Sequence, residues 1–539
     1  MKKMKYIKYI GIGAFVCLMS ACSDFLEEYS QDTYYVQSYE DLDEVLAGDC
    51  YLQVNGSNNA ASTENIGYFL PFLADEIEEQ NSGFLDDYGS MYVVYNIKEK
   101  VFGCYTWQQR IGQNHTYTGF ISENDTWKEV YRLINVANNV LESVEDVPQT
   151  TEDERLGVLR VKGEAHFLRG TYYFWLANLY GKPYNPSTAN TDLAVPVKLV
   201  AKVEDKAYQR NTVQEVYSQV LDDLQEAERS LSQTGAAANI YQADSVAVQL
   251  LLSRVYLYMQ NWQMAAVYAD KVLKARPELR NMNQTDRASG FLSKTSVETI
   301  FSMGGNDIPC NLEYACQGFR VSTELYNAYE EDDLRKSQWW WTRGTFIGYT
   351  KLAHGARFEA NAIDPEKDNF YYYAYDSGWE WQNAPVSDKF LFRTAEAYLN
   401  KAEAEACEGH EDVALAALNT LRQYRYAAGC AYEVNASGEA LVKAIREERR
   451  KELALEGHRW FDLRRYGVCE VCPESKQIVH NYTYYSGAGE TDMLYTHRFV
   501  LEENDPAYTL PIPQEVIDFN TGMKNNDLPW RSYTETEAN

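Results

Sequence analysis

Residues 444–467 read AIREERRKELALEGHRWFDLRRYG, and the rest of the chain can be organised around this stretch. Strong helix formers occupy residues 444–456 without an interrupting Gly or Pro, which predicts a helix, and Gly457 offers its end. Beyond the glycine, bulky apolar side chains alternate with charged ones across residues 458–465. The stretch therefore predicts one long charged helix followed by a cluster of bulky rings around Trp460 and Phe461, which we call the aromatic plug.

Three glutamates, Glu448, Glu452 and Glu456, follow one another at i, i+4 along the predicted helix. Such a row of like charges destabilises an isolated helix, so each acid needs a nearby base. Bases three residues away give the pairs Glu448–Lys451, Glu452–Arg449 and Glu456–Arg459. We expect Glu452 and Glu456 to meet the arginines of these pairs, or arginines further along, in a partly buried network behind Trp460. His458, Trp460 and the arginines are then core and ion-pair residues, not ligand contacts.

The composition excludes several classes of function. The chain has 539 residues and a net charge of −29, which argues against nucleic acid as a partner and against broad contact with anionic lipid. Its 43 Tyr against 20 Phe indicate many rings at surfaces and cleft mouths, because a tyrosine hydroxyl needs water or a hydrogen-bond partner. No HExxH, GxSxG or Walker motif is present, so no catalytic residue and no cofactor is predicted.

The N-terminus carries the features of an export signal. Lysines within residues 2–8 form a basic segment, and residues 10–19 form an apolar segment too short to span a membrane. The sequence LMSAC, ending at Cys22, resembles a bacterial lipobox, which implies cleavage before Cys22 and lipidation of its thiol. SDFLEE, at residues 23–28, resembles the acidic export tag of surface lipoproteins in Bacteroidetes. An ordinary signal peptide with an incidental cysteine is the alternative.

Cysteine usage leaves two interpretations open. Ten cysteines are present; Cys17 leaves with the signal and Cys22 carries the lipid, so an even number remains in a chain bound for an extracytoplasmic space. Cys469 and Cys472 form a CxxC pair, but a zinc ribbon would need a second one. Disulfides and free thiols are both compatible with this pattern.

Apolar periodicity predicts helices along most of the chain. Tyr256, Ala265 and Pro277 match the spacing of tetratricopeptide signature positions, in which a small Ala lets two helices approach and Pro ends the unit. Asn211 is a candidate N-cap for the helix that follows it. The predicted helices span residues 39–46, 125–144, 152–180, 212–231, 245–259, 262–275, 389–407, 411–426 and 440–456.

Three segments resemble one protein family. EERRKELALEGHRWFDLRRYG at 447–467, GEAHFLRGTYYFWLANLYGKPY at 163–184 and LPIPQEVIDFNTGMKNN at 510–526 are similar to the SusD/RagB-like nutrient-binding outer-membrane lipoproteins. The resemblance implies a mainly α fold, a tetratricopeptide-like superhelix of helix pairs with long irregular loop and short-strand insertions. The export features predict a signal peptide over residues 1–21, and because no Pro/Gly/Ser-rich linker divides the rest, we expect a single domain over residues 22–539.

The same resemblance implies a function. Family members are binding proteins, not enzymes, anchored by lipid to the outer membrane and facing outside. They capture oligosaccharides, or peptides in some members, and pass them to a SusC-like TonB-dependent transporter. The alternatives are a tetratricopeptide scaffold that only holds partner proteins, and a surface glycan hydrolase, for which the chain shows no motif. Aromatic-rich insertions favour ligand capture over a scaffold.

Two insertions, at about residues 74–115 and 276–387, are the expected place for ligand contacts, because loops on a rigid scaffold usually carry binding. Sugar binding needs flat aromatic faces for C–H packing and polar groups for the hydroxyls. Alternating rings indicate strands with one face exposed, although rings under a long loop also cover core. The candidate ligand contacts are Tyr92, Tyr95, Tyr105, Trp107, Arg110, Tyr373, Trp379 and Trp381. Trp339–Trp341 are expected to be structural, since consecutive strand residues cannot share a face.

An acidic cluster in the first insertion has two interpretations. Asp75, Glu76, Glu78 and Glu79 supply the oxygen ligands that calcium prefers. The same residues also form an acidic loop in contact with solvent, and this is the preferred interpretation. No metal is therefore assigned to the chain.

Overall fold

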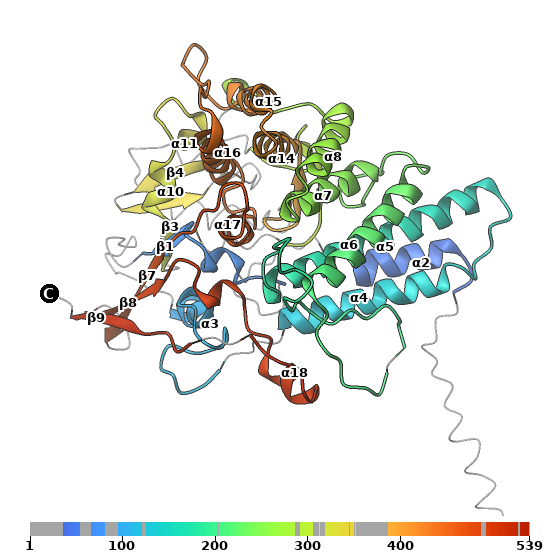
Figure 1. Ribbon diagram of the computed structural model, residues 1–539, viewed down its shortest axis with the longest axis horizontal. Helices are drawn as coiled ribbons and strands as arrows, with labels where there is room; N and C mark the ends of the chain where they lie inside the picture. The colour runs from blue at the N-terminus through green and yellow to red at the C-terminus, as the bar shows by residue number, and fades with distance from the viewer. Residues whose placement is uncertain are drawn as a thin grey trace, which may run out of the picture.

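The computed structural model describes residues 36–53, 66–80, 95–120, 125–202, 204–285, 291–305, 318–343, 345–349, 386–486, 492–526 and 529–537, together with Leu312 and Lys351. Helices dominate these residues and short strands lie among them, as Figure 1 shows. Within the ranges just given, no helix is both long and apolar enough to cross a membrane.

One long helix organises the N-terminal half of the fold. The helices there are α2 (Tyr39–Val45, continued by a π-helical turn at Leu46–Cys50), α4 (Asp125–Ser143), α5 (Glu152–Tyr180) and α6 (Val213–Leu231). Helices α2, α4 and α6 all pack against α5 (Figure 1). A capping box starts α5, in which Glu154 N–H donates to the Thr151 hydroxyl and Thr151 N–H to the Glu154 carboxylate. Thr212, not the expected Asn211, caps α6 by accepting from Glu215 N–H.

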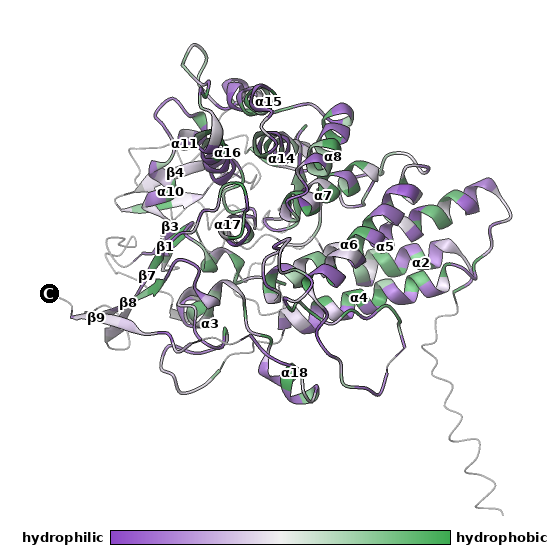
Figure 2. Ribbon diagram, in the orientation of Figure 1, coloured by the Kyte–Doolittle hydropathy of each residue, from purple (hydrophilic) through white to green (hydrophobic). Residues whose placement is uncertain are grey.

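The amphipathic pattern that predicted these helices is visible on the ribbon. Hydrophilic and hydrophobic residues are mixed along α4 and α6 (Figure 2). On α4, Trp127, Val130, Ile134 and Ala137 recur near the helical period and are all buried. The buried face of each helix therefore follows directly from its sequence.

Helix pairs continue in the second half. They are α7 (Ser245–Tyr258), α8 (Trp262–Ala275), α14 (Thr394–Cys407), α15 (Glu411–Gln423), α16 (Gly438–Glu452) and α17 (Arg459–Gly467). Ala265 on α8 is fully buried, and its carbonyl accepts from the Ser253 hydroxyl on α7 at 2.9 Å. Helix α14 packs against α8, α15 and α16 (Figure 1). The expected mainly α fold of tetratricopeptide-like pairs is thus confirmed.

Most of the short strands lie on the side of the molecule away from α2 and α4–α6, together with α10 (Thr323–Asn327) and α11 (Leu334–Trp339) (Figure 1). The antiparallel pairs are β1 (Ile77–Glu79) with β3 (Phe319–Val321), β2 (Thr299–Ser302) with β6 (Leu391–Arg393), β4 (Trp340–Arg343) with β5 (Phe346–Tyr349), and β7 (Ile478–Ser486) with β8 (Asp492–Leu501), which also pairs with β9 (Tyr533–Glu537). The other short helical segments are Leu70–Leu73, α3 (Tyr95–Tyr105), Met282–Gln284, Pro506–Tyr508 and α18 (Gln514–Phe519).

Two of these elements correct the sequence-based expectations. The segment 95–105 is helical, so the strands expected from its alternating rings are wrong there. The helix expected from residue 389 begins only at Thr394, because Leu391–Arg393 pair with β2 instead. The second difference arises because pairing with a distant strand outweighs the local helical pattern.

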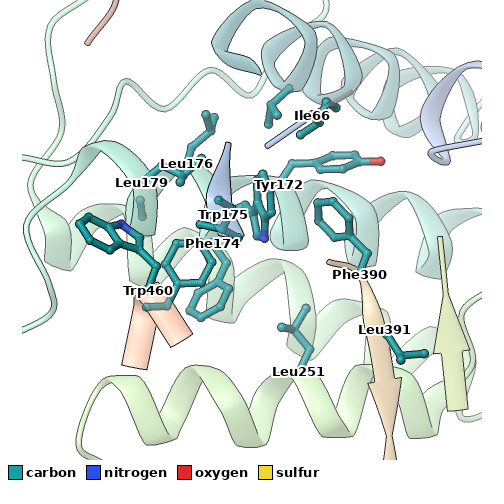
Figure 3. Packing of buried hydrophobic residues seen from close by; sticks show 14 of the residues in the cluster. Ile66, Tyr172, Phe174, Trp175, Leu176, Leu179, Leu251, Phe390, Leu391 and Trp460 are labelled. Carbon is teal, nitrogen blue, oxygen red and sulfur yellow. The ribbon is translucent and has the colours of Figure 1, made fainter. Parts of the chain in front are cut away.

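The aromatic plug lies in the core. Figure 3 shows Trp460 and Trp175 among the buried rings and aliphatic side chains between helices. Trp460 is stacked on Tyr508 with centroids 5.1 Å apart, and Trp175 packs on Phe390 at 4.6 Å. Gly67, with φ of 68°, faces the Trp175 ring so closely that a Cβ there would clash with it. The structural interpretation of the plug is therefore confirmed, as it is for the buried Trp339 and Trp340.

The charged helix ends earlier than its sequence predicts. Helix α16 stops at Glu452, and positive φ angles of 58° at Leu455 and 75° at Gly457 turn the chain before α17 begins. The alternating stretch after Gly457 is itself helical, as α17. Because of this turn, Glu456 is no longer on the face of α16, and its carboxylate contacts Arg393 and Lys351.

The expected ion-pair network exists, but with different partners and deeper burial. Glu452 contacts Arg335, Arg393 and Arg425, and Glu456 contacts Arg393 and Lys351. Of the local pairs, only Glu448 with Lys451 forms, at 3.4 Å. The other two are wrong, because the bases are taken elsewhere, in the contacts Arg449–Asp462 and Arg459–Asp75. Burial alone raises the pKa of Glu452, yet the three guanidinium groups outweigh it and hold that pKa well below its usual range.

Candidate functional site

Exposed rings gather beside the C-terminal sheet. Phe120, Trp530 and Tyr533 have 52%, 61% and 43% of their surface exposed, and Tyr117 is half-buried next to them. The rings of Tyr117 and Trp530 pack against each other with centroids 5.5 Å apart. Burial raises the pKa of Tyr117 to about 12, and the neighbouring Tyr533 adds to the shift. We call Tyr117, Phe120, Trp530 and Tyr533 the aromatic surface.

A tight turn presents the first two of these rings. Asn114 closes it, since its side-chain oxygen accepts from the backbone N–H groups of Thr118 and Gly119 at 3.1 and 3.2 Å. Tyr117 has a positive φ of 57°, a conformation that the turn imposes. Beneath the turn, the Tyr117 ring meets the buried Phe102 edge-on at 5.6 Å. The turn is therefore fixed on the core although its tip is exposed.

Trp530 is held by its neighbour in sequence. Arg531 is buried and forms two hydrogen bonds with the Asp505 carboxylate, at 2.6 and 2.8 Å. Its guanidinium also donates to the backbone carbonyls of Val500 and Trp107. Because the next residue is fixed in this way, the exposed Trp530 ring has a rigid base.

The far end of the aromatic surface is also ordered by stacking. Tyr533 on β9 lies parallel to His497 on β8, with ring centroids 3.7 Å apart. His497 Nε2 lies 3.0 Å from the Glu535 carboxylate. These contacts cover one face of Tyr533 and leave its exposed part toward solvent.

This arrangement has the chemistry that carbohydrate recognition requires. Flat rings that are partly exposed, as Phe120, Trp530 and Tyr533 are, can pack on the C–H faces of a sugar. Hydroxyl and amide groups for the sugar hydroxyls are adjacent, from Asn114, Thr116 and Thr118 of the same turn. Arg110 adds a cation, since its guanidinium lies 3.7 Å from the Phe120 ring centroid.

Arg110 is the predicted contact that the structure places at this surface. Tyr105 and Trp107 lie elsewhere, with only 1% and 3% of their surface exposed. Both rings stack on His480, at 4.1 and 4.4 Å between centroids, and Trp107 Nε1 donates to the Leu73 carbonyl. Their proposed role as stacking faces for ligand is therefore corrected to a core role.

The remaining predicted contacts stay predictions. Tyr95 is described only as the first residue of α3, and nothing is assigned to its side chain. Cys22, Tyr92, Tyr373, Trp379 and Trp381 lie outside the described residues. Sequence reasoning missed the four rings of the aromatic surface, because isolated aromatics in a turn and a terminal segment show no periodic signal.

The acidic cluster of Asp75, Glu76, Glu78 and Glu79 does not form the solvent-exposed loop expected from the sequence. Asp75 is buried and pairs with Arg450, Arg459 and Lys476. Glu79 is buried against Lys98. Cations thus neutralise Asp75 and Glu79, while the buried Glu76 accepts from the Leu455 N–H and burial raises its pKa to about 7. Over the described part of the chain, no group of three or more His, Cys, Asp or Glu is arranged to hold a metal.

Comparison with known proteins identifies related chains. Residues 291–530 match the family described as SusD family, and residues 51–257 match the one described as starch-binding associating with outer membrane. SusD-like protein P25 of Formosa agariphila is 22% identical over 99% of this chain and 100% of its own. Among solved structures, a SusD superfamily protein from Bacteroides thetaiotaomicron has a TM-score of 0.64 at 20% identity, covering 91% of this chain and 100% of its own. Surface glycan-binding protein A from Bacteroides fluxus has a TM-score of 0.60 at 18% identity, covering 91% and 99%.

Proposed function

Because this chain belongs to the SusD/RagB-like family, we propose that it is a surface-exposed outer-membrane lipoprotein that captures oligosaccharides and passes them to a SusC-like TonB-dependent transporter. The observation that carries the proposal is the aromatic surface, where Trp530 and Phe120 are exposed on a rigid base. The descriptions of the matched family as starch-binding and of the Bacteroides fluxus protein as glycan-binding support the same ligand class.

Capture without cleavage is the proposed activity. Family members bind their ligands, and the chain contains none of the catalytic motifs considered above. The proposed ligand contacts are the aromatic surface with Arg110, together with Tyr92, Tyr95, Tyr373, Trp379 and Trp381 from the insertions. Lipid on Cys22 supplies the proposed anchor, and the transporter is the proposed membrane partner.

A glycan panel tests the ligand class. The mature chain without its lipid is run on native gels that contain one polysaccharide each, and hits are measured by calorimetry with oligosaccharides of the same type. Retarded migration and saturable heat are expected for at least one glycan, with no new reducing ends in the mixture. Binding of peptides alone would instead favour the peptide-binding members of the family, and new reducing ends would identify a hydrolase.

The transporter partnership needs its own experiment. The full-length chain, tagged at its C-terminus, is purified from detergent-solubilised outer membranes of a host that carries the neighbouring genes. A TonB-dependent transporter is expected to co-purify in a fixed ratio. Recovery of the chain without any transporter would contradict this part of the proposal and leave glycan binding intact.

A further inference from the structure

A cleft lies where four distant segments converge. Its volume is about 580 Å³, and it is lined by residues 182–193 after α5, Arg210 before α6, residues 463–476 from the end of α17 onward, and residues 504–526 near the C-terminus. Tyr508 forms an aromatic wall, because it stacks on Trp460 and its hydroxyl donates to the Lys476 carbonyl at 2.7 Å. Its lining is otherwise rich in charged, hydroxyl and amide side chains.

Most of the charges around the cleft cancel in pairs. Lys182 lies 3.1 Å from Asp192, Lys476 lies 2.5 Å from Asp75, and Asp505 is held by Arg531. Three lining cations remain after this pairing, namely Arg210, Arg464 and Lys524. No carboxylate of the described chain lies within ion-pair distance of any of them. A protein with a net charge of −29 therefore contains one cleft with an excess of positive charge.

Arg210 and Arg464 bind backbone carbonyls at the end of α5, and these contacts do not neutralise their positive charges. Arg210 uses all five of its N–H donors on oxygens of the protein, among them the Leu193, Ala194 and Lys524 carbonyls, so it offers a ligand its charge but no donor. Its donation to the Tyr180 carbonyl at 3.0 Å joins those of Arg464, 3% exposed, to the Asn178 and Gly181 carbonyls. These carbonyls end α5, and a helix C-terminus carries only about half a negative charge. Two full positive charges on one half-charge leave an excess. Arg464 Nε–H also has no acceptor among the described residues.

The pKa values of Arg464 and Arg210 agree with the absence of a carboxylate partner. Burial lowers the pKa of Arg464 to about 10, and also that of Arg210 to about 10. Each group is still cationic near neutral pH, yet each is less stabilised than an arginine beside a carboxylate. An incoming anion would supply the missing partner charge.

The third cation stands on a fixed segment. The Lys524 carbonyl accepts from Arg210 at 3.1 Å, and Asn526 donates to the Tyr180 and Leu510 carbonyls at 2.8 and 2.7 Å. Asn525 bonds both the N–H and the carbonyl of Ile512. The Lys524 side chain is exposed, so its ammonium is free to reach a bound ligand from this anchored backbone.

We propose that this cleft binds an oxyanion carried by a sugar, a carboxylate or a sulfate group, and so selects acidic oligosaccharides. The inference rests on the proposed function, because it takes the anion to be part of a carbohydrate. Carboxylate and sulfate both accept hydrogen bonds from an ammonium group such as that of Lys524, and the charges of Arg210 and Arg464 behind it add attraction. The net negative charge of the rest of the protein repels such ligands only at long range, where salt screens it.

Calorimetry on the mature chain tests the inference with three oligosaccharides of equal length: a uronic-acid oligomer, a sulfated oligomer and a neutral oligomer. Lys524→Glu should weaken binding of an acidic ligand by at least about tenfold, since attraction becomes repulsion in a confined cleft. Lys524→Arg should keep the affinity.

The control is Lys443→Glu, which makes the same charge change at an exposed lysine on α16 and should have little effect on the affinity. Unchanged melting temperatures for all three variants exclude misfolding.

The outcomes separate the two proposals. Preference for the uronic or the sulfated oligomer, lost in Lys524→Glu and with higher salt, supports the inference and names the anion. Tight binding of the neutral oligomer alone, or equal losses in Lys524→Glu and Lys443→Glu, overturns the inference and leaves carbohydrate capture standing. Absence of binding to every glycan overturns both.

Discussion

Arg393, the last residue of β6, donates from Nε to a carboxylate oxygen of Glu456 at 2.8 Å, across 63 residues of sequence. Both side chains are fully buried. The same guanidinium also reaches Glu452 and Glu298, so one arginine joins the end of α16 to the short sheet of β2 and β6. The buried guanidinium of Arg393 therefore ties the end of α16 and the turn after it to the β2–β6 sheet.

Glu456→Ala should destabilise the fold strongly. It leaves Arg393 and Lys351 buried with one acid fewer, and breaking a buried pair typically costs about 3–5 kcal/mol of unfolding free energy. Denaturant unfolding of the mature chain, followed by tryptophan fluorescence, measures the loss. Glu439→Ala is the matched control, because Glu439 is exposed on the first turn of α16. A loss for Glu456→Ala no larger than the control would contradict the buried network.

Trp530→Ala should weaken glycan binding without unfolding the protein. An aromatic anchor at an interface contributes about 1–3 kcal/mol of binding free energy, and an exposed ring adds little to the core. Calorimetry with the best glycan of the panel measures the change. Phe519→Ala, which removes an exposed ring from α18, should leave the affinity unchanged. Equal affinities for Trp530→Ala and the parent would remove the aromatic surface as the site.

Trp107→Ala should have the opposite effect. The ring is buried on His480 and its Nε1 donates to Leu73, so truncation should lower the unfolding free energy by about 3–5 kcal/mol. The molecules that stay folded should bind glycan as the parent does. A variant with parental stability but lost affinity would return Trp107 to the ligand site.

Glu164→Gln should change the pH dependence of stability. Burial raises the pKa of Glu164 to about 7, and its described partner is the Tyr51 hydroxyl at 2.8 Å. The folded state thus holds a proton that the unfolded state loses near its ordinary pKa, so this contribution falls as pH rises through about 7. The variant should match the parent near pH 4, where both states of the parent are protonated, and exceed it by up to about 3 kcal/mol near pH 8. Denaturant titrations at several pH values decide, and a difference that does not vary with pH would refute the assignment.

Cys22→Ala should leave the protein without lipid. The thiol of Cys22 follows the small residues of the predicted cleavage site, and lipid attachment there needs that thiol. Labelled palmitate followed by blotting of membrane fractions measures the incorporation. Replacement of Cys17, inside the signal, should not change it. Label retained on the Cys22 variant would show that the anchor is elsewhere.

Local chemistry in the sequence determined most of the helices. The segment 152–180 was predicted and found with the same bounds, because a capping box starts it and Gly181 follows it. Trp460 and the arginines beside it were likewise assigned to the core, because the row of three glutamates requires nearby bases. Such features depend on residues a few positions apart, and so they can be read from sequence.

Only the tertiary structure decided which charges pair and which rings are exposed. Glu452 pairs with Arg335, Arg393 and Arg425 in place of the local Arg449. Packing of distant segments brings these three guanidinium groups within ion-pair distance of the Glu452 carboxylate. Trp107 is buried while Trp530 is exposed, although both lie in irregular segments. Pairing and exposure are properties of packing between segments far apart in the chain, and no local pattern encodes them.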